Sequence, residues 1–252
     1  MNENNQSKHA PQTAPEQYWN RAGEVGYAEA MYTSGKVATH VKTGMRTTIL
    51  EAAQSVGLNQ NSTILELGCG DGDLANEFLS KHFKSIEAHD LAPAGIESAN
   101  KNRRPNTQFF CSDITKLTFE PGKRYDSVFL IGILHHVKKE TPDIIERLIK
   151  ITDKIVVLEP NGNHIGRKFL ETLPSYKNAG EDSFRKKEFE KIFTDRGFSQ
   201  TYFKRFNLFP NFTPDGLFPM VKRLEPMIEN TKALNFLCTC QVFAFEKNKK
   251  GG

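Results

Sequence analysis

The sequence lacks any long apolar run, and no uninterrupted stretch approaches the roughly 18 to 20 residues that span a bilayer. Its first residues, 1–15, are polar, whereas a secretory signal peptide needs an apolar centre. We therefore expect neither a membrane-spanning helix nor a classical export signal. We therefore expect a location in the cytoplasm.

Cysteine is also scarce, with four residues among 252, and no two of them form a C-x-x-C pair. Such a set does not suit a disulfide scaffold or a zinc site, so we expect free thiols. Charge of one sign is not in excess either, because 34 Lys and Arg residues face 30 Asp and Glu residues. A net charge of +4 without a concentrated basic stripe does not support nucleic-acid binding. The oligomeric state stays open.

The composition is that of a globular chain, with 38% hydrophobic and 25% charged residues. The length favours one large domain. Residues 1–15, rich in Asn, Gln, Ser and Pro, are predicted to form a disordered tail because nothing there offsets the entropy of ordering.

After this tail, helical and strand patterns alternate. Apolar residues from Val37 to Ile49 recur at helical spacing and predict an amphipathic helix that runs toward Gly57. Thr141 and Pro142 predict the N-cap and the first position of a later helix. Further helices are expected over residues 73–80, 94–101 and 186–196. Strands are expected over residues 63–67, 84–89, 108–111, 125–131, 154–158, 198–206 and about 238–245. This alternation predicts an α/β fold with a doubly wound, Rossmann-like parallel sheet that binds ligands at the carboxyl ends of its strands.

The segment Glu66-Leu67-Gly68-Cys69-Gly70-Asp71-Gly72 joins the first expected strand to a helix. Glycines there let the backbone turn sharply and let a ligand approach the main chain, although a plain tight turn is the alternative. A dinucleotide fingerprint has Gly or Ala where this chain has Asp73. The carboxylates of Glu66 and Asp73 would oppose a pyrophosphate. The turn therefore favours a ligand without phosphates that carries positive charge, such as a sulfonium with an ammonium group.

The same segment resembles the first motif of the class I S-adenosylmethionine-dependent methyltransferases, and the order of elements agrees with that family over residues 19–246. The resemblance implies a seven-stranded sheet of order 3-2-1-4-5-7-6 with strand 7 antiparallel. It implies S-adenosyl-L-methionine as cofactor and S-adenosyl-L-homocysteine as product. It also divides one domain at 16–247 into an N-terminal helical cap at 16–57, a cofactor-binding half at 62–160 and a substrate-side half at 161–247, followed by a tail at 248–252.

The resemblance also assigns residues to the cofactor. Asp90, at the end of the second expected strand, would hold both ribose hydroxyls, or else cap the next helix. Asp113 would accept from the adenine amino group with Ile114 against the ring, or else lie in a surface turn. The full expected set of cofactor contacts is Glu66, Gly68, Cys69, Gly70, Asp90, Leu91, Asp113, Ile114, Ile131, Tyr27 and Tyr32, the two tyrosines having a small satellite core as their alternative.

Catalytic candidates follow the fourth and fifth expected strands. His135 has the unperturbed pKa of a base near neutrality, and Glu159 could orient it or act itself. A purely structural role for His135 or His136 is the alternative. We expect no metal, because adjacent histidines point in different directions and the sequence spacing offers no third ligand.

The resulting interpretation is a methyltransferase acting on an oxygen or nitrogen of a small-molecule acceptor. An RNA or protein methyltransferase and a non-catalytic S-adenosylmethionine-binding module stay open. The chain lacks an asparagine-proline-proline-aromatic motif after the fourth strand, which disfavours macromolecular acceptors.

Two segments carry no chemical assignment. The phenylalanine- and proline-rich connection at 207–230 is expected to fill space beside the sixth strand, with an acceptor lid or lipid contact as the alternative. Cys238 and Cys240 are expected on one face of the last strand as small core residues.

Overall fold

The structure, a computed structural model of the chain, describes residues 34–178, 181–210 and 213–248. The expected tail at 1–15, most of the expected helical cap, and both Tyr27 and Tyr32 lie outside the described residues. Within the described ranges, no helix has both the length and the apolarity to cross a membrane.

Seven strands form one sheet of order β3-β2-β1-β4-β5-β7-β6, in which β7 runs antiparallel to both of its neighbours. The predicted fold class and strand order are confirmed. Strands β1, β4 and β5 are apolar and buried on both faces, as helices on both sides of a parallel sheet require. The strands are β1 Thr63–Leu67, β2 Ser85–Asp90, β3 Thr107–Cys111, β4 Ser127–Ile131, β5 Lys154–Pro160, β6 Phe198–Phe206 and β7 Cys240–Lys247.

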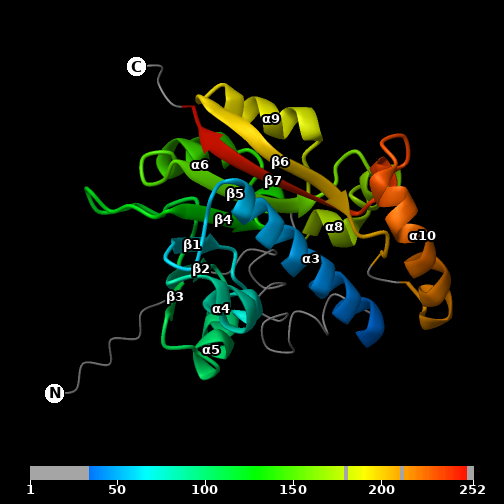
Figure 1. The fold of residues 1–252 in the computed structure, drawn as a ribbon, viewed down its shortest axis with the longest axis horizontal. Coiled ribbons are helices and arrows are strands. Elements are labelled where there is room, and N and C mark those ends of the chain that lie inside the picture. The colour runs from blue at the N-terminus through cyan, green and yellow to red at the C-terminus, as the bar shows by residue number, and fades with distance from the viewer. Residues whose placement is uncertain (1–33, 179–180, 211–212, 249–252) are drawn as a thin grey trace.

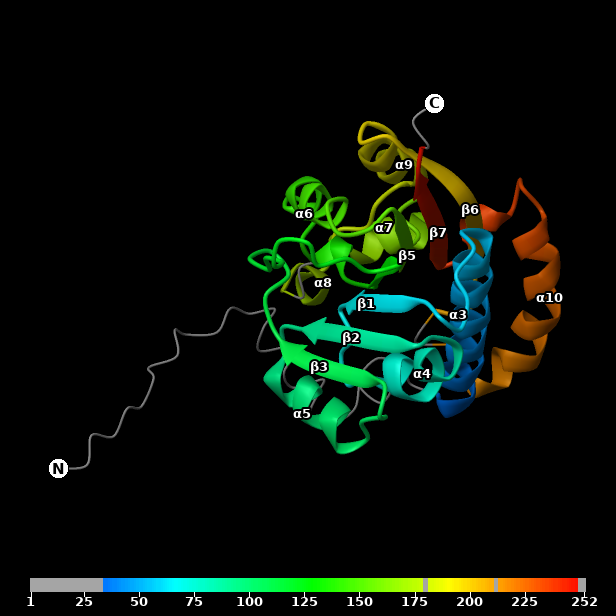
Figure 2. The same cartoon turned by 60° about the vertical axis from the view of Figure 1, so that its left-hand side comes forward.

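Two hydrophobic layers pack against the two faces of this sheet. One contains side chains of α3, α5 and the turn of helix after β1, and the other contains side chains of α6 and α9. Figures 1 and 2 show α3 crossing the face that α6 and α9 leave free. The longer helices are α3 Gly35–Ser55, α5 Pro93–Lys101, α6 Thr141–Leu148, α9 Lys186–Thr194 and α10 Phe218–Asn230. Shorter ones are η1 Ala75–Leu79, α4 Ser80–His82, η2 Leu134–His136, α7 Ile165–Leu170, α8 Pro174–Asn178, η3 Asp215–Leu217 and η4 Asn235–Leu237.

The helix expected over residues 73–80 differs from the prediction in its winding. Its central part, η1, is a π-helix, and a short α4 follows it. Insertions of this kind are frequent beside functional sites. Here the widened turn comes directly after the glycine segment that ends β1.

The connection at 207–230 contains a helix that the sequence analysis did not expect. Pro219 lies in the first turn of α10, where a missing N–H costs nothing, but Pro226 lies inside the helix and argued against one. Phe209 is buried against α3, with Phe218 packed beside it, so this part fills space as predicted. Met220 is more than half exposed. Figure 2 shows α10 lying along the outer side of α3.

Two smaller predictions were wrong. Thr141 is not an N-cap but the first residue of α6, and its hydroxyl donates to the Val137 carbonyl at 3.0 Å. Thr141 is fully buried, so its hydroxyl needs a hydrogen-bond acceptor, and it bonds to a carbonyl of the preceding loop instead of capping the helix. Cys238 lies before β7, which begins at Cys240, so the two thiols do not share a strand face.

Candidate functional site

The chain turns sharply where β1 ends, at the carboxyl edge of the sheet. Gly68 has a φ of +85°, a conformation that residues with a Cβ rarely adopt. A Cβ at this position would lie 2.8 Å from the Cβ of Ile133 and 3.2 Å from the Ile131 carbonyl oxygen. Only glycine lets the turn pass this close to the end of β4. The predicted glycine turn is therefore a tight junction between two neighbouring strand ends.

Glu66 lies at the base of this turn and is almost completely buried. Burial, followed by the negative charges of Asp90, Asp73 and Asp71, raises the pKa of Glu66 to about 8. Its Oε2 atom has no hydrogen-bond partner among the described residues. A buried polar atom without a partner is costly and rare, and a donor from a bound ligand would satisfy it.

Asp90 lies at the end of β2, beside the turn. Its Oδ2 accepts from the Gly70 N–H at 2.8 Å, and its Oδ1 accepts from the Ala92 N–H at 2.9 Å. Burial raises the pKa of the Asp90 carboxyl, while these backbone donors oppose the rise. The side chain therefore fixes the glycine turn against the start of α5, and its two oxygens still have acceptor capacity for ligand hydroxyls.

The expected adenine contacts lie at the ends of the next strands. Leu91 is 40% exposed directly after Asp90, so its side chain is available to a ligand. Asp113 accepts from the Thr115 N–H at 2.9 Å and pairs with Lys116 at 2.9 Å. Partial burial opposes ionisation of Asp113, but the bonds from Thr115 and Lys116 outweigh it and lower its pKa. Asp113 thus lies in a turn whose own residues already donate to its carboxylate, and Ile114 packs partly buried beside it. The ligand role of Asp113 stays a prediction.

Two cations from α3 reach the glycine turn, and the sequence analysis missed them. The Lys42 ammonium lies 3.1 Å from Asp73 Oδ1, and the Arg46 guanidinium lies 2.8 Å from Asp73 Oδ2. The charge of Asp73 is therefore matched, so its predicted opposition to a phosphate is weaker than we expected. No spacing rule links these residues, because only the packing of α3 over the turn brings them together.

The second part of the site lies where β4 and β5 end. Gly132 has a φ of +62° and turns the chain directly after β4. This turn directs the next three N–H groups toward Glu159, which β5 places beside the end of β4. Glu159 is fully buried and accepts from the N–H groups of Ile133 at 3.1 Å, Leu134 at 2.8 Å and His135 at 3.3 Å.

His135 is held between two carboxylates. Its Nδ1 lies 2.6 Å from Glu159 Oε2, and its Nε2 lies 3.3 Å from Glu181 Oε2. Burial lowers the pKa of His135, but the charges and hydrogen bonds of Glu159 and Glu181 outweigh burial and raise it to about 9. At neutral pH His135 is therefore protonated. The prediction that it acts as a base needs its Nε2 to leave Glu181 and lose a proton.

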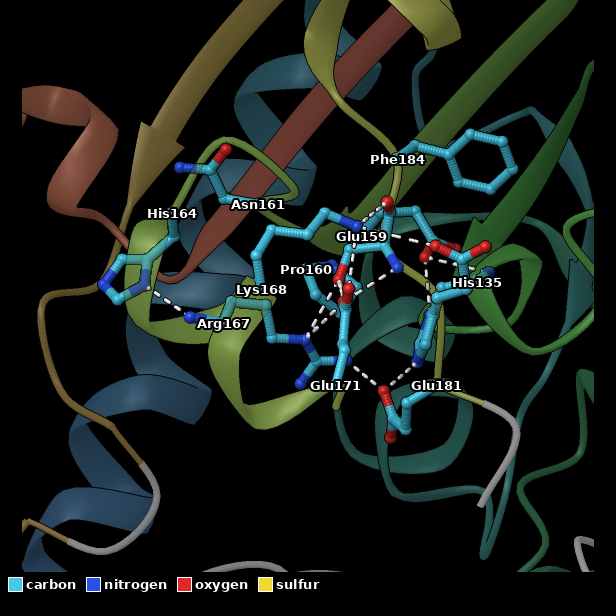
Figure 3. A network of polar contacts seen from close by, with 12 residues as sticks. His135, Glu159, Pro160, Asn161, His164, Arg167, Lys168, Glu171, Glu181 and Phe184 are labelled. Atoms are coloured by element: carbon cyan, nitrogen blue, oxygen red, sulfur yellow. Dashed lines mark hydrogen bonds and ion pairs between the residues drawn. The ribbon is translucent and has the colours of Figure 1, made fainter. Parts of the chain in front are cut away.

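Glu181 was not found from the sequence, because it comes after α8 and far from both histidines along the chain. Burial raises its pKa, but hydrogen bonding to His135 and the charges of His135 and Arg167 outweigh burial and lower the pKa to about 2. The Arg167 guanidinium forms an ion pair with the same carboxylate. Figure 3 shows Glu181 lying between the Arg167 guanidinium and the His135 ring. No feature of the local sequence around residue 181 indicates this contact.

A separate cavity of about 440 Å³ lies among the segment Thr118–Arg124 and the residues Arg147, Lys150 and Ile151. These residues precede β4 and β5, so the cavity is at the amino ends of the strands. Ligands of doubly wound sheets bind at the opposite, carboxyl ends. The candidate site is therefore the edge that carries Glu66, Asp90 and His135.

The sheet order and the glycine turn define the fold class of the class I S-adenosylmethionine-dependent methyltransferases. Residues 64–154, which contain the turn, Asp90, Asp113 and His135, match the family model described as a methyltransferase domain. This match and the fold confirm the predicted resemblance to the class I S-adenosylmethionine-dependent methyltransferases.

Solved structures of the same fold cover nearly the whole chain. Magnesium protoporphyrin IX methyltransferase from Synechocystis PCC 6803, solved with S-adenosylhomocysteine, is 15% identical with a TM-score of 0.61, over 92% of this chain and 97% of that one. N-methyltransferase NodS from Bradyrhizobium japonicum WM9, also solved with S-adenosylhomocysteine, is 14% identical with a TM-score of 0.61, over 94% and 100%. A putative methyltransferase from Haloferax volcanii, in complex with the activator Trm112, is 14% identical with a TM-score of 0.61, over 92% and 98%. No protein with a curated description matches the sequence.

Proposed function

We propose that this protein binds S-adenosyl-L-methionine at the glycine turn and transfers its methyl group to an oxygen or nitrogen of a small-molecule acceptor. The observation that carries the proposal is Glu66, a buried carboxyl at the base of the turn, one oxygen of which has no hydrogen-bond partner in the described part of the chain. A ligand with an ammonium group supplies the donor and the positive charge that this carboxyl lacks. The cofactor of the two neighbours solved with S-adenosylhomocysteine is consistent with this choice.

In this proposal each side of the cofactor meets a different strand end. Glu66 pairs with the ammonium group, and Asp90 accepts from the ribose hydroxyls while it keeps its bonds to the backbone. Leu91 and Ile114 contact the adenine, and Asp113 accepts from its amino group. The remaining proposed contacts are Gly68, Cys69, Gly70, Ile131, Tyr27 and Tyr32.

S-adenosylmethionine supplies a methyl carbon that is already activated for in-line displacement. The protein must therefore position the acceptor and, for a hydroxyl or ammonium acceptor, remove a proton. His135 is the proposed base, with Nε2 as the accepting atom once it separates from Glu181. Glu159 holds the His135 ring through Nδ1 and has both of its oxygens engaged, so we assign it positioning and not proton removal.

A small-molecule acceptor is supported by the balanced overall charge and by the names of similar structures, which include a magnesium protoporphyrin IX methyltransferase and an N-methyltransferase. An RNA or protein acceptor remains the second candidate. The observation that favours it is the Haloferax volcanii structure, a putative methyltransferase that binds a separate activator protein. A binding module without turnover is the third.

Thermal unfolding with added ligands tests the cofactor assignment. A ligand that binds only the folded state raises its stability by about 2.7 kcal/mol at a concentration one hundred times its Kd. We expect S-adenosylmethionine and S-adenosylhomocysteine to raise the Tm, and NADH to leave it unchanged. The variant Asp90→Asn keeps one acceptor oxygen and should lose most of the shift, whereas the exposed Asp143→Ala should keep it.

Stabilisation by NADH alone, or by none of the three ligands, would contradict the cofactor assignment. If the adenosyl ligands do stabilise the protein, incubation with labelled S-adenosylmethionine and separate pools of metabolites, RNA and proteins distinguishes the acceptor classes. Label in the small-molecule fraction is the expected result. Label only in RNA or protein would replace the proposed acceptor, and label in no fraction would favour the binding module.

A further inference from the structure

We propose that His135, His136 and Glu181 bind one divalent transition-metal ion, with Zn²⁺ as the best match, at the acceptor side of the site. One potential ligand atom from each of these three residues lies within 4.8 Å of the other two. The histidines come from η2 and the carboxylate from the segment after α8, so the fold creates a set that the sequence does not display. Adjacent histidines can therefore serve together, contrary to the sequence-based expectation of no metal.

The ligand types select the class of ion. Two imidazoles and one carboxylate suit Zn²⁺ and its first-row neighbours, whereas Ca²⁺ and Mg²⁺ prefer sets made of oxygen atoms. Three protein ligands with an open fourth position are the usual arrangement of a catalytic zinc site, while structural sites use four. The cluster therefore fits an ion that keeps a position for an exogenous molecule.

The separation between His135 and Glu181 also fits a shared ion. Two atoms that each lie about 2.1 Å from a tetrahedral zinc ion are about 3.4 Å apart. His135 Nε2 lies 3.3 Å from Glu181 Oε2. A direct charge-assisted hydrogen bond between such groups is usually shorter, about 2.7 to 2.9 Å. The two side chains are thus already spaced as ligands of one ion.

The residues behind the cluster supply the support that metal sites need. Histidine ligands usually donate their second ring N–H to a carboxylate, which fixes the tautomer and the ring orientation. Glu159 does this for His135, at 2.6 Å from Nδ1, and is itself held by backbone N–H groups. Arg167 pairs with the same Oε2 atom of Glu181 and also donates to the Ser183 hydroxyl at 3.0 Å, so the carboxylate is held in place but a bound ion must share this oxygen with the guanidinium. In Figure 3 this arrangement leaves the His135 ring edge directed at Glu181.

The position of the cluster gives the ion a role. It lies beyond the ends of β4 and β5, next to the glycine turn that we assign to the cofactor. An ion bound at His135 Nε2 excludes that atom as the base, so the ion would replace His135 in activating the acceptor. It would hold a hydroxyl, carboxylate or phenolate oxygen of the acceptor and orient it toward the cofactor. This role rests on the proposed function, whereas metal binding itself does not.

The test measures metal binding directly on the full chain, freed of any polyhistidine tag and treated with chelator. We expect calorimetry to give one Zn²⁺ per chain, and Co²⁺ to give visible absorption bands of a low-coordinate N/O site. His136→Gln should weaken Zn²⁺ binding by at least about tenfold. His82→Gln removes a histidine that ends α4 and is not part of the cluster, and it should leave the affinity unchanged.

Glu159→Gln keeps the shape behind His135 and should weaken binding less than His136→Gln does. S-adenosylhomocysteine-induced stabilisation of each variant reports whether it folds and keeps the cofactor site. No stoichiometric Zn²⁺ binding in the wild type, or equal binding by His136→Gln and His82→Gln, would overturn the metal site even if S-adenosylhomocysteine still binds. Zn²⁺ binding without any adenosyl ligand binding would instead support the metal site and overturn the proposed function.

Discussion

Around the glycine turn, burial and nearby acidic groups raise the pKa of Glu66, and no donor among the described residues reaches its Oε2. Around His135, in contrast, each buried carboxylate faces a cation. The two regions lie next to each other at one edge of the sheet, joined by the contact between Gly68 and Ile133. Groups built for a charged ligand stay unsatisfied until it binds, while a framework that must hold a loop is satisfied within the chain. The surroundings of Glu66 are therefore an unsatisfied region, and the surroundings of His135, Glu159 and Glu181 are an assembled region, in which a bound metal ion would replace the contact between His135 and Glu181.

The largest loss of stability on substitution is expected at Glu159, in the assembled region. Glu159→Ala would remove the acceptor of three backbone N–H groups and leave the protonated His135 with less compensation in a buried place. We expect a loss of about 3 to 5 kcal/mol in the free energy of unfolding, measured with denaturant. Glu97→Ala, at an exposed position of α5, serves as control and should change stability by less than about 0.5 kcal/mol. A much smaller loss in Glu159→Ala would show that Glu159 does not stabilise the loop that follows β4.

At Glu66, in the unsatisfied region, we expect a substitution to raise the free energy of unfolding and not to lower it. The pKa of Glu66 is about 8 in the folded protein and 4.5 as the ordinary value. Between these values the folded state keeps a proton that the unfolded state has lost, so this group's contribution to stability falls as pH rises through the window. The fall amounts to about 4 to 5 kcal/mol by pH 8. The substitution Glu66→Gln removes this pH-dependent fall in stability.

We therefore expect ligand-free Glu66→Gln to gain stability over the wild type as pH is raised from about 5 to 8, in denaturant unfolding at each pH. The same substitution removes the proposed partner of the cofactor ammonium. It should thus weaken S-adenosylhomocysteine binding while it stabilises the empty protein, a trade-off expected where a site stores unfavourable charge. Parallel stability-versus-pH curves for the two proteins would mean that Glu66 is ionised in the folded state.

The smallest effect is expected at Asp73. Asp73→Asn breaks the pairs with Lys42 and Arg46, whose side chains are 35% and 23% exposed, and partly exposed pairs contribute little. It also removes one of the charges that raise the pKa of Glu66. These opposing contributions should leave the free energy of unfolding within about 1 kcal/mol of the wild type. A larger loss would mean that Lys42 and Arg46 hold α3 over the turn mainly through Asp73.

The sequence allowed the unsatisfied region to be predicted better than the assembled one. Glu66, Gly68 and Gly70 belong to one short segment, so the spacing of glycines and carboxylates along the chain already describes the turn. Glu181 reaches His135, and Arg167 reaches Glu181, only because α7 and the segment after α8 fold back beside β5. Nothing in the sequence near these residues marks the contacts. Pro226 likewise hid α10, since a proline inside a helix is tolerated only where packing compensates for it.

The central claim is that the carboxyl of Glu66 binds the ammonium group of the cofactor. A double comparison in calorimetry tests this claim most directly. S-adenosylhomocysteine carries that group, and 5′-methylthioadenosine keeps the nucleoside but lacks it. We predict that the wild type binds S-adenosylhomocysteine far more tightly than 5′-methylthioadenosine, and that Glu66→Gln loses most of this preference. An equal preference in the wild type and in Glu66→Gln would contradict the claim.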